Sequence, residues 1–187
     1  LPNHSNTLLQ LYMKKLIVVL LVSCGLFYGA SAQTDKNRTT ATKIADLLAK
    51  TPADDSAQLY KNAAAVADLG EAGITELARQ LENGGDPTRI KDAISGFSFH
   101  ATKAGRENWR SLATNSYGKA LSSLSKPEAQ FFLITQLEQV GKDDAVIYLV
   151  PFLKDERLSS DASRALATIN TESSKQSLLN ALSASGG

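Results

Sequence analysis

The sequence predicts an all-α protein, an α-solenoid in which about nine short helices form antiparallel pairs after a signal segment. Three observations lead to this prediction. Alanine and leucine are frequent, whereas aromatic residues make up only 6% of the chain, and this composition favours helix. Apolar residues recur at helical spacing in short segments that glycine, proline or asparagine separates. Finally, the last helix pairs resemble each other at a constant offset, which is typical of a repeat array.

The first element is a predicted secretory signal over residues 13–32. It opens with a methionine and two lysines, continues with the apolar run LIVVLLV at 16–22, and ends in an Ala-Ser-Ala pattern that predicts cleavage after Ala32. Its apolar part is marginal for the roughly 20 residues of a membrane span, so cleavage is favoured over retention as a transmembrane helix. Residues 1–12 fit no part of a signal, and we interpret them as an upstream extension outside the fold.

Cys24 introduces an alternative to simple cleavage. The stretch Leu21-Val22-Ser23-Cys24 resembles the lipobox of bacterial lipoproteins, in which a lipid on the cysteine anchors the chain. Apolar residues follow Cys24 where a lipoprotein usually turns polar, so we favour soluble export to the periplasm or beyond. The mature chain would then have no cysteine and hence no disulfide.

The charge balance excludes two classes of partner. The chain carries 20 basic and 19 acidic residues. Such a balance leaves neither the basic footprint of a nucleic-acid-binding protein nor a polybasic membrane patch. Membrane contact is expected only if Cys24 is lipidated or the signal is retained.

Five helices are predicted in the N-terminal part of the repeat domain, which we place at 33–182. Their apolar stripes lie within 39–50, 55–69, 72–81, 86–97 and 105–124. Gly70 is expected to end the second helix. Asp86 and Pro87 match the N-cap and first-turn proline of the fourth. Gly105 is expected to form a turn, and Gly118 should weaken the middle of the fifth helix.

Four further helices complete the prediction. They cover 128–140, 143–153, 158–169 and 173–182, and the tail 183–187 is predicted to be disordered. Ser125 to Glu128 matches a capping box, and Asp143 is predicted to cap the next helix. Pro151 should bend that helix. Because the helices are short and many, an array of pairs is favoured over a closed bundle.

An internal repeat supports the array. One constant offset places an apolar set of the first copy on an apolar set of the second. The first set is Leu133, Leu137, Val140, Leu149, Val150 and Leu153; the second is Ala162, Leu166, Ile169, Leu178, Leu179 and Leu182. The same offset places Gly141 on Asn170, and both residue types tolerate a left-handed helix cap.

The segment Leu153–Leu182 resembles a bacterial HEAT repeat, and is most similar to the short kind named after phycobilisome bilin lyases. Its helix end Ala165-Leu166-Ala167-Thr168-Ile169-Asn170 matches the family's Ala-Leu-x-x-Ile-Gly, with Asn170 in place of glycine. Asp161 stands where the family often has the arginine of an Asp–Arg ladder. The resemblance is good over 128–182 and weak over 39–124. It implies a solenoid scaffold and no lyase activity, because such repeats serve many functions.

The sequence shows no catalytic or metal-binding motif of a familiar kind, so we expect neither an enzyme nor a cofactor. His100 is the only histidine after the predicted cleavage site, and no cysteine pair accompanies it. Gly-x-Ser-x-Gly and phosphate-loop motifs are absent. The acidic pairs Asp54-Asp55 and Asp143-Asp144 each stand at a predicted helix start, where acids complement the helix dipole.

The stretch FSFHATKAGRENWR, residues 97–110, is the richest in side chains that could bind a partner. Its Gly-Phe-x-Phe-His and Gly-Arg-Glu elements are similar to those of exported bacterial HEAT-repeat proteins of unknown function. The candidate binding residues are His100, Lys103, Arg106, Trp109 and Arg110. Tryptophan and arginine commonly anchor interfaces. In the alternative, Phe97 and Trp109 pack in the core and the cations are solvated. Both hold if the rings point inward and the cations outward.

We therefore expect a non-catalytic exported helical-repeat scaffold that mediates protein–protein interaction. The alternative is a small module that binds an anionic peptide or glycan through the region of His100, Arg106 and Trp109. An enzyme is the least favoured class.

Overall fold

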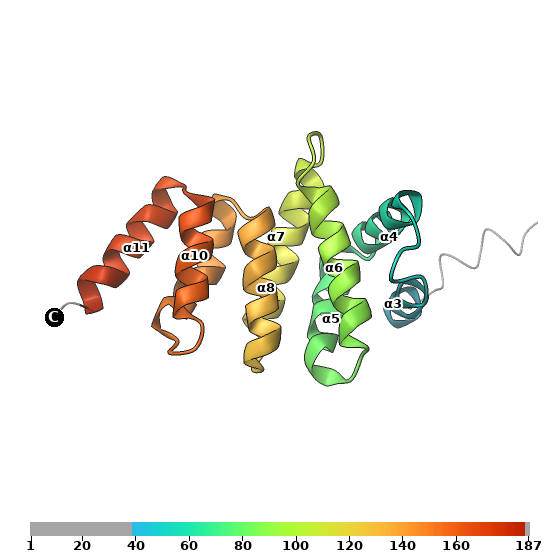
Figure 1. The fold of residues 1–187 in the computed structure, drawn as a ribbon, viewed down its shortest axis with the longest axis horizontal. Coiled ribbons are helices and arrows are strands. Elements are labelled where there is room, and N and C mark those ends of the chain that lie inside the picture. The colour runs from blue at the N-terminus through green and yellow to red at the C-terminus, as the bar shows by residue number, and fades with distance from the viewer. Residues whose placement is uncertain (1–38, 186–187) are drawn as a thin grey trace, which may run out of the picture. The chain divides into compact units, whose positions relative to one another are not determined.

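The computed structural model describes residues 39–185, so the predicted signal, Cys24 and residues 1–12 lie outside the described part of the chain. Within residues 39–185 the regular elements are nine α-helices and two short 3₁₀ segments, with no strand (Figure 1). The predicted all-α class is confirmed for this part of the protein. No helix in it is long and apolar enough to cross a membrane.

The N-terminal helices begin and end close to their predicted limits. They are α3 (Thr40–Ala49), α4 (Ser56–Asp68), α5 (Gly70–Asn83), α6 (Pro87–Ala101) and α7 (Glu107–Leu121). Asp55 caps α4 through a backbone N–H that donates to its carboxylate at 2.7 Å. Asp86 caps α6 in the same way at 3.0 Å. Gly105 adopts φ 74° in the turn before α7, a conformation that costs glycine little.

The C-terminal helices follow the predicted order. They are α8 (Pro127–Val140), α9 (Val146–Leu149) between the 3₁₀ segments Asp143–Ala145 and Val150–Lys154, α10 (Ser159–Ile169) and α11 (Glu172–Ser185). Pro151 lies where the α-helix gives way to 3₁₀ geometry, as its missing N–H would cause. Asn170 adopts φ 54° and closes α10 with the predicted left-handed cap. The last helix extends past the predicted end at Leu182.

The predicted capping box at Ser125 is wrong. The residue before α8 is Lys126, and its side chain forms no capping bond. Instead, the backbone N–H groups of Ser125 and Lys126 donate to the carboxylate of Glu82 in α5, the Ser125 bond measuring 2.5 Å. These bonds hold the pKa of Glu82 below its usual range, and the bond from Lys126 has the larger effect.

One further local prediction is also wrong. Asp143 does not cap its segment, which follows Lys142; its carboxylate accepts a hydrogen bond from the Ser173 hydroxyl of α11. Gly141 is extended, with φ −65° and ψ 152°, and not left-handed. Glycine is required there for space, because a Cβ would lie 2.4 Å from the carbonyl oxygen of Leu137.

The helices pack as neighbouring pairs and also along two rows. In one row α4 contacts α6, α6 contacts α8, and α8 contacts α10. Figure 1 shows α6, α8 and α10 side by side. In the other row α5 contacts α7, α7 contacts α9, and α9 contacts α11. The core lies between the rows and includes Ile74, Phe97, Tyr117 and Leu137. The row of α4, α6, α8 and α10 is called the even row below.

The residues matched by the internal repeat have similar environments. Leu137 of α8 and its counterpart Leu166 of α10 are both fully buried. Val150 and its counterpart Leu179 are both exposed, at 37% and 58%. The similarity does not extend to every matched pair, because Leu153 packs against the core and its counterpart Leu182 is 71% exposed.

Candidate functional site

Side chains from α4, α6 and α7 meet at the C-terminal end of α6. We call this group the aromatic–cation cluster; it consists of Tyr60, Phe99, His100, Lys103, Arg106 and Trp109. Tyr60 comes from α4, Phe99 and His100 from α6, and Trp109 from the first turn of α7. Lys103 and Arg106 lie in the turn that joins α6 to α7.

Arg106 is held against two aromatic rings. Its Nη2 donates a hydrogen bond to the Tyr60 hydroxyl at 2.8 Å. Its guanidinium carbon lies 4.5 Å from the centroid of Trp109 and 5.4 Å from that of Tyr60. The two rings are nearly parallel, with centroids 6.2 Å apart. A guanidinium over aromatic faces is attracted by their quadrupoles, so this arrangement orients the cation.

His100 lies between two rings that meet it edge to face. The centroid distances are 5.5 Å to Tyr60 and 5.2 Å to Phe99. Its Nε2 is buried and has no hydrogen-bond partner among the described residues. This burial is the main reason that the pKa of His100 is lowered, and the charges of Lys103 and Arg106 lower it further. The imidazole is therefore neutral at pH 7.

The cluster is exposed and its two permanent cations lack acidic partners. Lys103 Nζ lies 3.9 Å from the ring centroid of Phe99. The exposed fractions of Tyr60 and Phe99 are 41% and 44%. Among residues 39–185, neither Lys103 nor Arg106 forms an ion pair. Exposed aromatic surface and uncompensated positive charge thus share one place on the molecule.

The rings of residues 97–110 divide between core and surface. Phe97 is fully buried. Trp109 is half-buried, packs against the core, and lies 5.6 Å from Phe97 between ring centroids. The interpretation that both rings pack in the core therefore holds fully for Phe97 and partly for Trp109, which links the core to the exposed cluster.

Arg110 is separate from the cluster. Its Nε donates a 2.6 Å hydrogen bond to the carbonyl oxygen of Val140, which is the last residue of α8. Together with Glu107 and Lys142 it lines a different hollow of about 290 Å³. Consecutive helical residues point about 100° apart, so Arg110 faces α8 while Trp109 faces α4.

Sequence reasoning missed Tyr60, which is far from the stretch along the chain. A Cβ at Gly96 would lie 2.9 Å from Leu59 Cδ1, so Gly96 allows α4 to approach α6 closely at the residue next to Tyr60. The glycine that precedes Phe97 was the available indication. Phe99 was within the stretch, but its exposure became apparent only in the folded chain.

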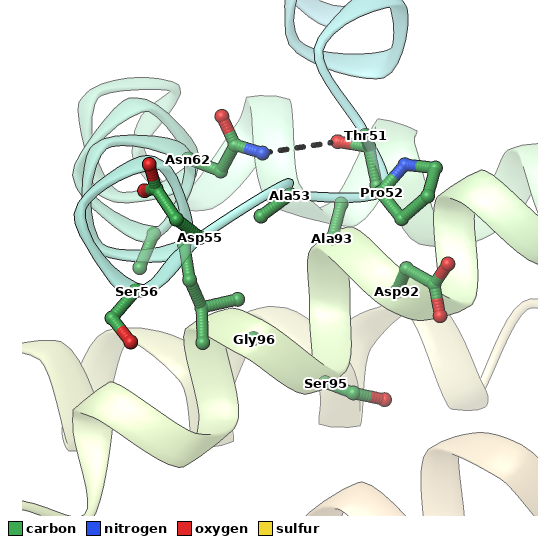
Figure 2. Close-up of a pocket in the computed structure, with 12 residues that line it drawn as sticks. Thr51, Pro52, Ala53, Asp55, Ser56, Asn62, Asp92, Ala93, Ser95 and Gly96 are labelled. Carbon is green, nitrogen blue, oxygen red and sulfur yellow. Dashed lines mark hydrogen bonds between the residues drawn. The ribbon is translucent and has the colours of Figure 1, made fainter.

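A second feature is a cleft of about 330 Å³ between the α3–α4 connection and α6 (Figure 2). Three of its polar side chains, Thr51, Asp55 and Asn62, bond to the backbone around it. Asn62 Nδ2 donates to the carbonyl of Lys50 at 2.8 Å and to Thr51 Oγ1 at 3.5 Å. Asp55 caps α4, as described above. The residues lining this cleft include no cation, histidine or cysteine, and we do not assign chemistry to it.

A third feature is a groove of about 330 Å³ on the even row. It is lined by Lys91, Pro127, Glu128, Phe131, Phe132, Arg157, Leu158 and Asp161. Lys91 Nζ lies 5.7 Å from the ring centroid of Phe132, and Phe131 is 44% exposed. The groove is apolar at its base and carries charges of both signs at its edge.

Across residues 39–185, no group of three or more His, Cys, Asp and Glu side chains is placed to hold a metal ion. No family model, curated protein or solved structure matches the chain.

Proposed function

We propose that this protein is a non-catalytic, exported helical-repeat scaffold that binds a protein partner through the even row. The observation that carries the proposal is the aromatic–cation cluster, in which exposed rings surround two cations without acidic partners. Aromatic and arginine side chains are the types that most often anchor protein interfaces. An exposed group of them is therefore best explained by a binding partner.

The packing of the helices supports a solenoid of HEAT-like repeats. Apart from α8 and α9, consecutive helices are in contact, and each helix also contacts the helix two places along the chain. In a repeat array each unit buries one face against the next, and this pattern of contacts is the result. Such an array offers a long surface and no enclosed pocket, which favours a macromolecular ligand.

The even row offers more than one point of contact. Tyr60 on α4, Phe99 on α6 and Phe131 on α8 are each between 41% and 44% exposed. The groove beside Phe131 adds an apolar depression to the same row. The cluster lies at the C-terminal end of α6 and the groove near the first turns of α6 and α8, so an extended segment is needed to contact both.

The geometry of Trp109 favours a protein over a glycan. Sugar-binding tryptophans offer an open ring face for stacking, but the guanidinium of Arg106 already lies over the ring of Trp109. Catalysis has little support, because one acid of each pair has a structural role: Asp55 caps α4, and Asp143 accepts a hydrogen bond from Ser173.

The test is an affinity capture from envelope extract with the exported form as bait. We expect a specific protein to be retained by the wild type and lost with the double substitution Arg106→Gln and Phe99→Ser. The matched control is Arg79→Gln, an exposed arginine on α5 in the other row. Equal retention by the cluster variant and the control would contradict the proposed function.

A further inference from the structure

We infer that the aromatic–cation cluster is a proton-linked carboxylate receptor: a carboxylate in an acidic segment of the partner binds beside Arg106 and Lys103, and His100 takes up a proton as it binds. The inference rests on the proposed function. It adds the chemistry of the bound segment and a dependence of affinity on pH.

The cluster presents hydrogen-bond donors with no carboxylate to receive them. Of the five N–H donors of Arg106, the structure pairs one, with the Tyr60 hydroxyl. The Tyr60 hydroxyl accepts that bond, which leaves its own O–H free to donate outward. The Lys103 ammonium makes a contact with the Phe99 ring and forms no ion pair in the described part of the chain. Donors that lie together on a positive site are complementary to an oxyanion.

The charges that act on His100 are all positive. They are the Lys103 ammonium and the Arg106 guanidinium, and the third titratable neighbour is the neutral Tyr60 hydroxyl from α4. The nearest acid along the chain is Glu107 in the first turn of α7. Its Oε1 accepts a 3.3 Å hydrogen bond from the Gly105 N–H, and it lines the hollow with Arg110. Neither cation is therefore paired with an acid of the described chain, which leaves both available to a ligand carboxylate.

Binding of a carboxylate changes the balance at His100. In the free protein, burial and the two cations keep the imidazole neutral, with Nε2 unpartnered. A carboxylate offsets those cations and so raises the pKa of His100 toward its ordinary value, although burial, the larger cause of the lowering, remains. Linkage then requires that protonation favour binding to the same extent that binding favours protonation.

The sign of the pH dependence follows. The pKa of His100 in the free protein lies below its ordinary value near 6.5, and in the complex it lies higher. Affinity therefore rises as the pH falls through the interval between these two values. Below the lower value both forms are protonated and the affinity levels off, as long as the ligand carboxylate remains ionised.

The exposed rings favour a peptide as the source of the carboxylate. Phe99 and Tyr60 flank the cations and are partly exposed, so they offer apolar surface to the residues on either side of the acid. The segment that fits best is therefore acidic with aromatic or aliphatic neighbours. A carboxylate-bearing glycan has the same negative charge but lacks these apolar neighbours. The experiment below distinguishes it from a peptide.

The test titrates the purified exported form with the peptide acetyl-Leu-Glu-Phe-Glu-Leu-amide. The comparison ligands are its glutamine counterpart, an oligogalacturonate and inorganic phosphate. Trp109 is the only tryptophan of the chain and reports binding by fluorescence. Calorimetry at about pH 6 in two buffers of different ionisation enthalpy measures proton uptake, and NMR follows the His100 ring directly.

We expect the acidic peptide to bind at least about tenfold more tightly than the glutamine peptide, with net proton uptake and a rise in the pKa of His100. Arg106→Gln should weaken binding by a similar factor. His100→Asn should lose both the proton uptake and the pH dependence of whatever affinity it retains. NMR detects the titration of His100 in the wild type, so proton uptake is tested even if His100→Asn does not fold.

Three outcomes would overturn the inference: equal affinity for the glutamine peptide, binding without proton uptake, or binding of the oligogalacturonate or phosphate in preference to the peptide. None of these outcomes bears on the proposed function, which the affinity capture tests separately. A partner that is lost with the cluster variant, but binds independently of carboxylates, would keep the proposed function and remove the inference.

Discussion

Arg106, in the turn after α6, and Arg164, on α10, have opposite surroundings. Arg164 Nε lies 3.1 Å from Glu138 of α8, and its Nη1 lies 2.8 Å from Asp161. The hydrogen bond to Glu138 is the main reason that the pKa of Arg164 is raised, and the bond to Asp161 raises it further. Arg106 contacts one hydroxyl and two rings, and no carboxylate of the described chain.

The difference separates charges that connect helices from charges available to a ligand. Glu138 also accepts a 3.0 Å hydrogen bond from the Thr168 hydroxyl, so α8 and α10 are connected twice. Arg164 also pairs with Asp161, three residues before it on α10, so one cation holds acids of two helices. The α6–α7 turn has no such network, and its cations remain uncompensated.

The largest expected loss of stability comes from Gly118→Val, which disturbs the packing of α7 against α9. A Cβ at Gly118 on α7 would lie 2.2 Å from the ring of Tyr148 on α9. Forcing that ring away should lower the free energy of unfolding by about 3 kcal/mol, measured by urea denaturation. Ser111→Val, at an exposed position of the same helix, controls for helix propensity. An equal loss in both variants would contradict the packing role of Gly118.

Arg110→Ala should have the next largest effect. It removes the hydrogen bond to the Val140 carbonyl, and the loss should be about 1–2 kcal/mol in the same denaturation assay. Binding of the acidic peptide should be unchanged, because Arg110 lies outside the cluster. Weakened binding with unchanged stability would move Arg110 from a structural to a binding role.

Arg164→Ala should cost less than about 1 kcal/mol, because the arginine is half exposed and its ion pairs are screened by solvent. The loss should shrink at high salt, which screens exposed charges. Arg106→Gln should show no comparable salt-dependent loss. A salt-dependent loss of stability in Arg106→Gln would contradict the distinction between cations that connect helices and cations that are available to a ligand.

The smallest effect is the pH dependence of stability from His100. Its pKa is lowered in the folded protein, so the unfolded chain takes up the proton at higher pH. Stability should therefore fall as the pH drops through about 6.5 and level off below the folded pKa. His100→Asn should remove this part of the profile, as followed by the urea midpoint from neutral to acidic pH. A profile unchanged by the substitution would show that other groups cause it.

Local patterns predicted helices well and long-range caps poorly. Asp55 and Asp86 cap through backbone groups within a few residues, so their roles are visible in the sequence. Ser125 and Asp143 matched the same local rule but not the structure, because partners distant in the chain engage them. Gly141 ends α8 as predicted, but what requires glycine there is the space near Leu137 and Ala145 and not a left-handed backbone.

The candidate site was partly predictable for the same reason. His100, Lys103, Arg106 and Trp109 lie within one turn-forming stretch, and chain connectivity alone keeps them close. Tyr60 could not be assigned from the sequence, because its place beside His100 depends on the packing of α4 against α6.

The sequence by itself determined the all-helical class, the approximate limits of the helices and the chemical character of residues 97–110, since these depend on periodicity and short-range connectivity. Tertiary packing decided which cations are compensated. Arg110 and Arg164 meet acceptors on α8, whereas Arg106 and Lys103 meet only rings and a hydroxyl. The physical reason is that a charge is neutralised by what lies within a few ångströms in space, and for these residues that is set by helices distant in the chain.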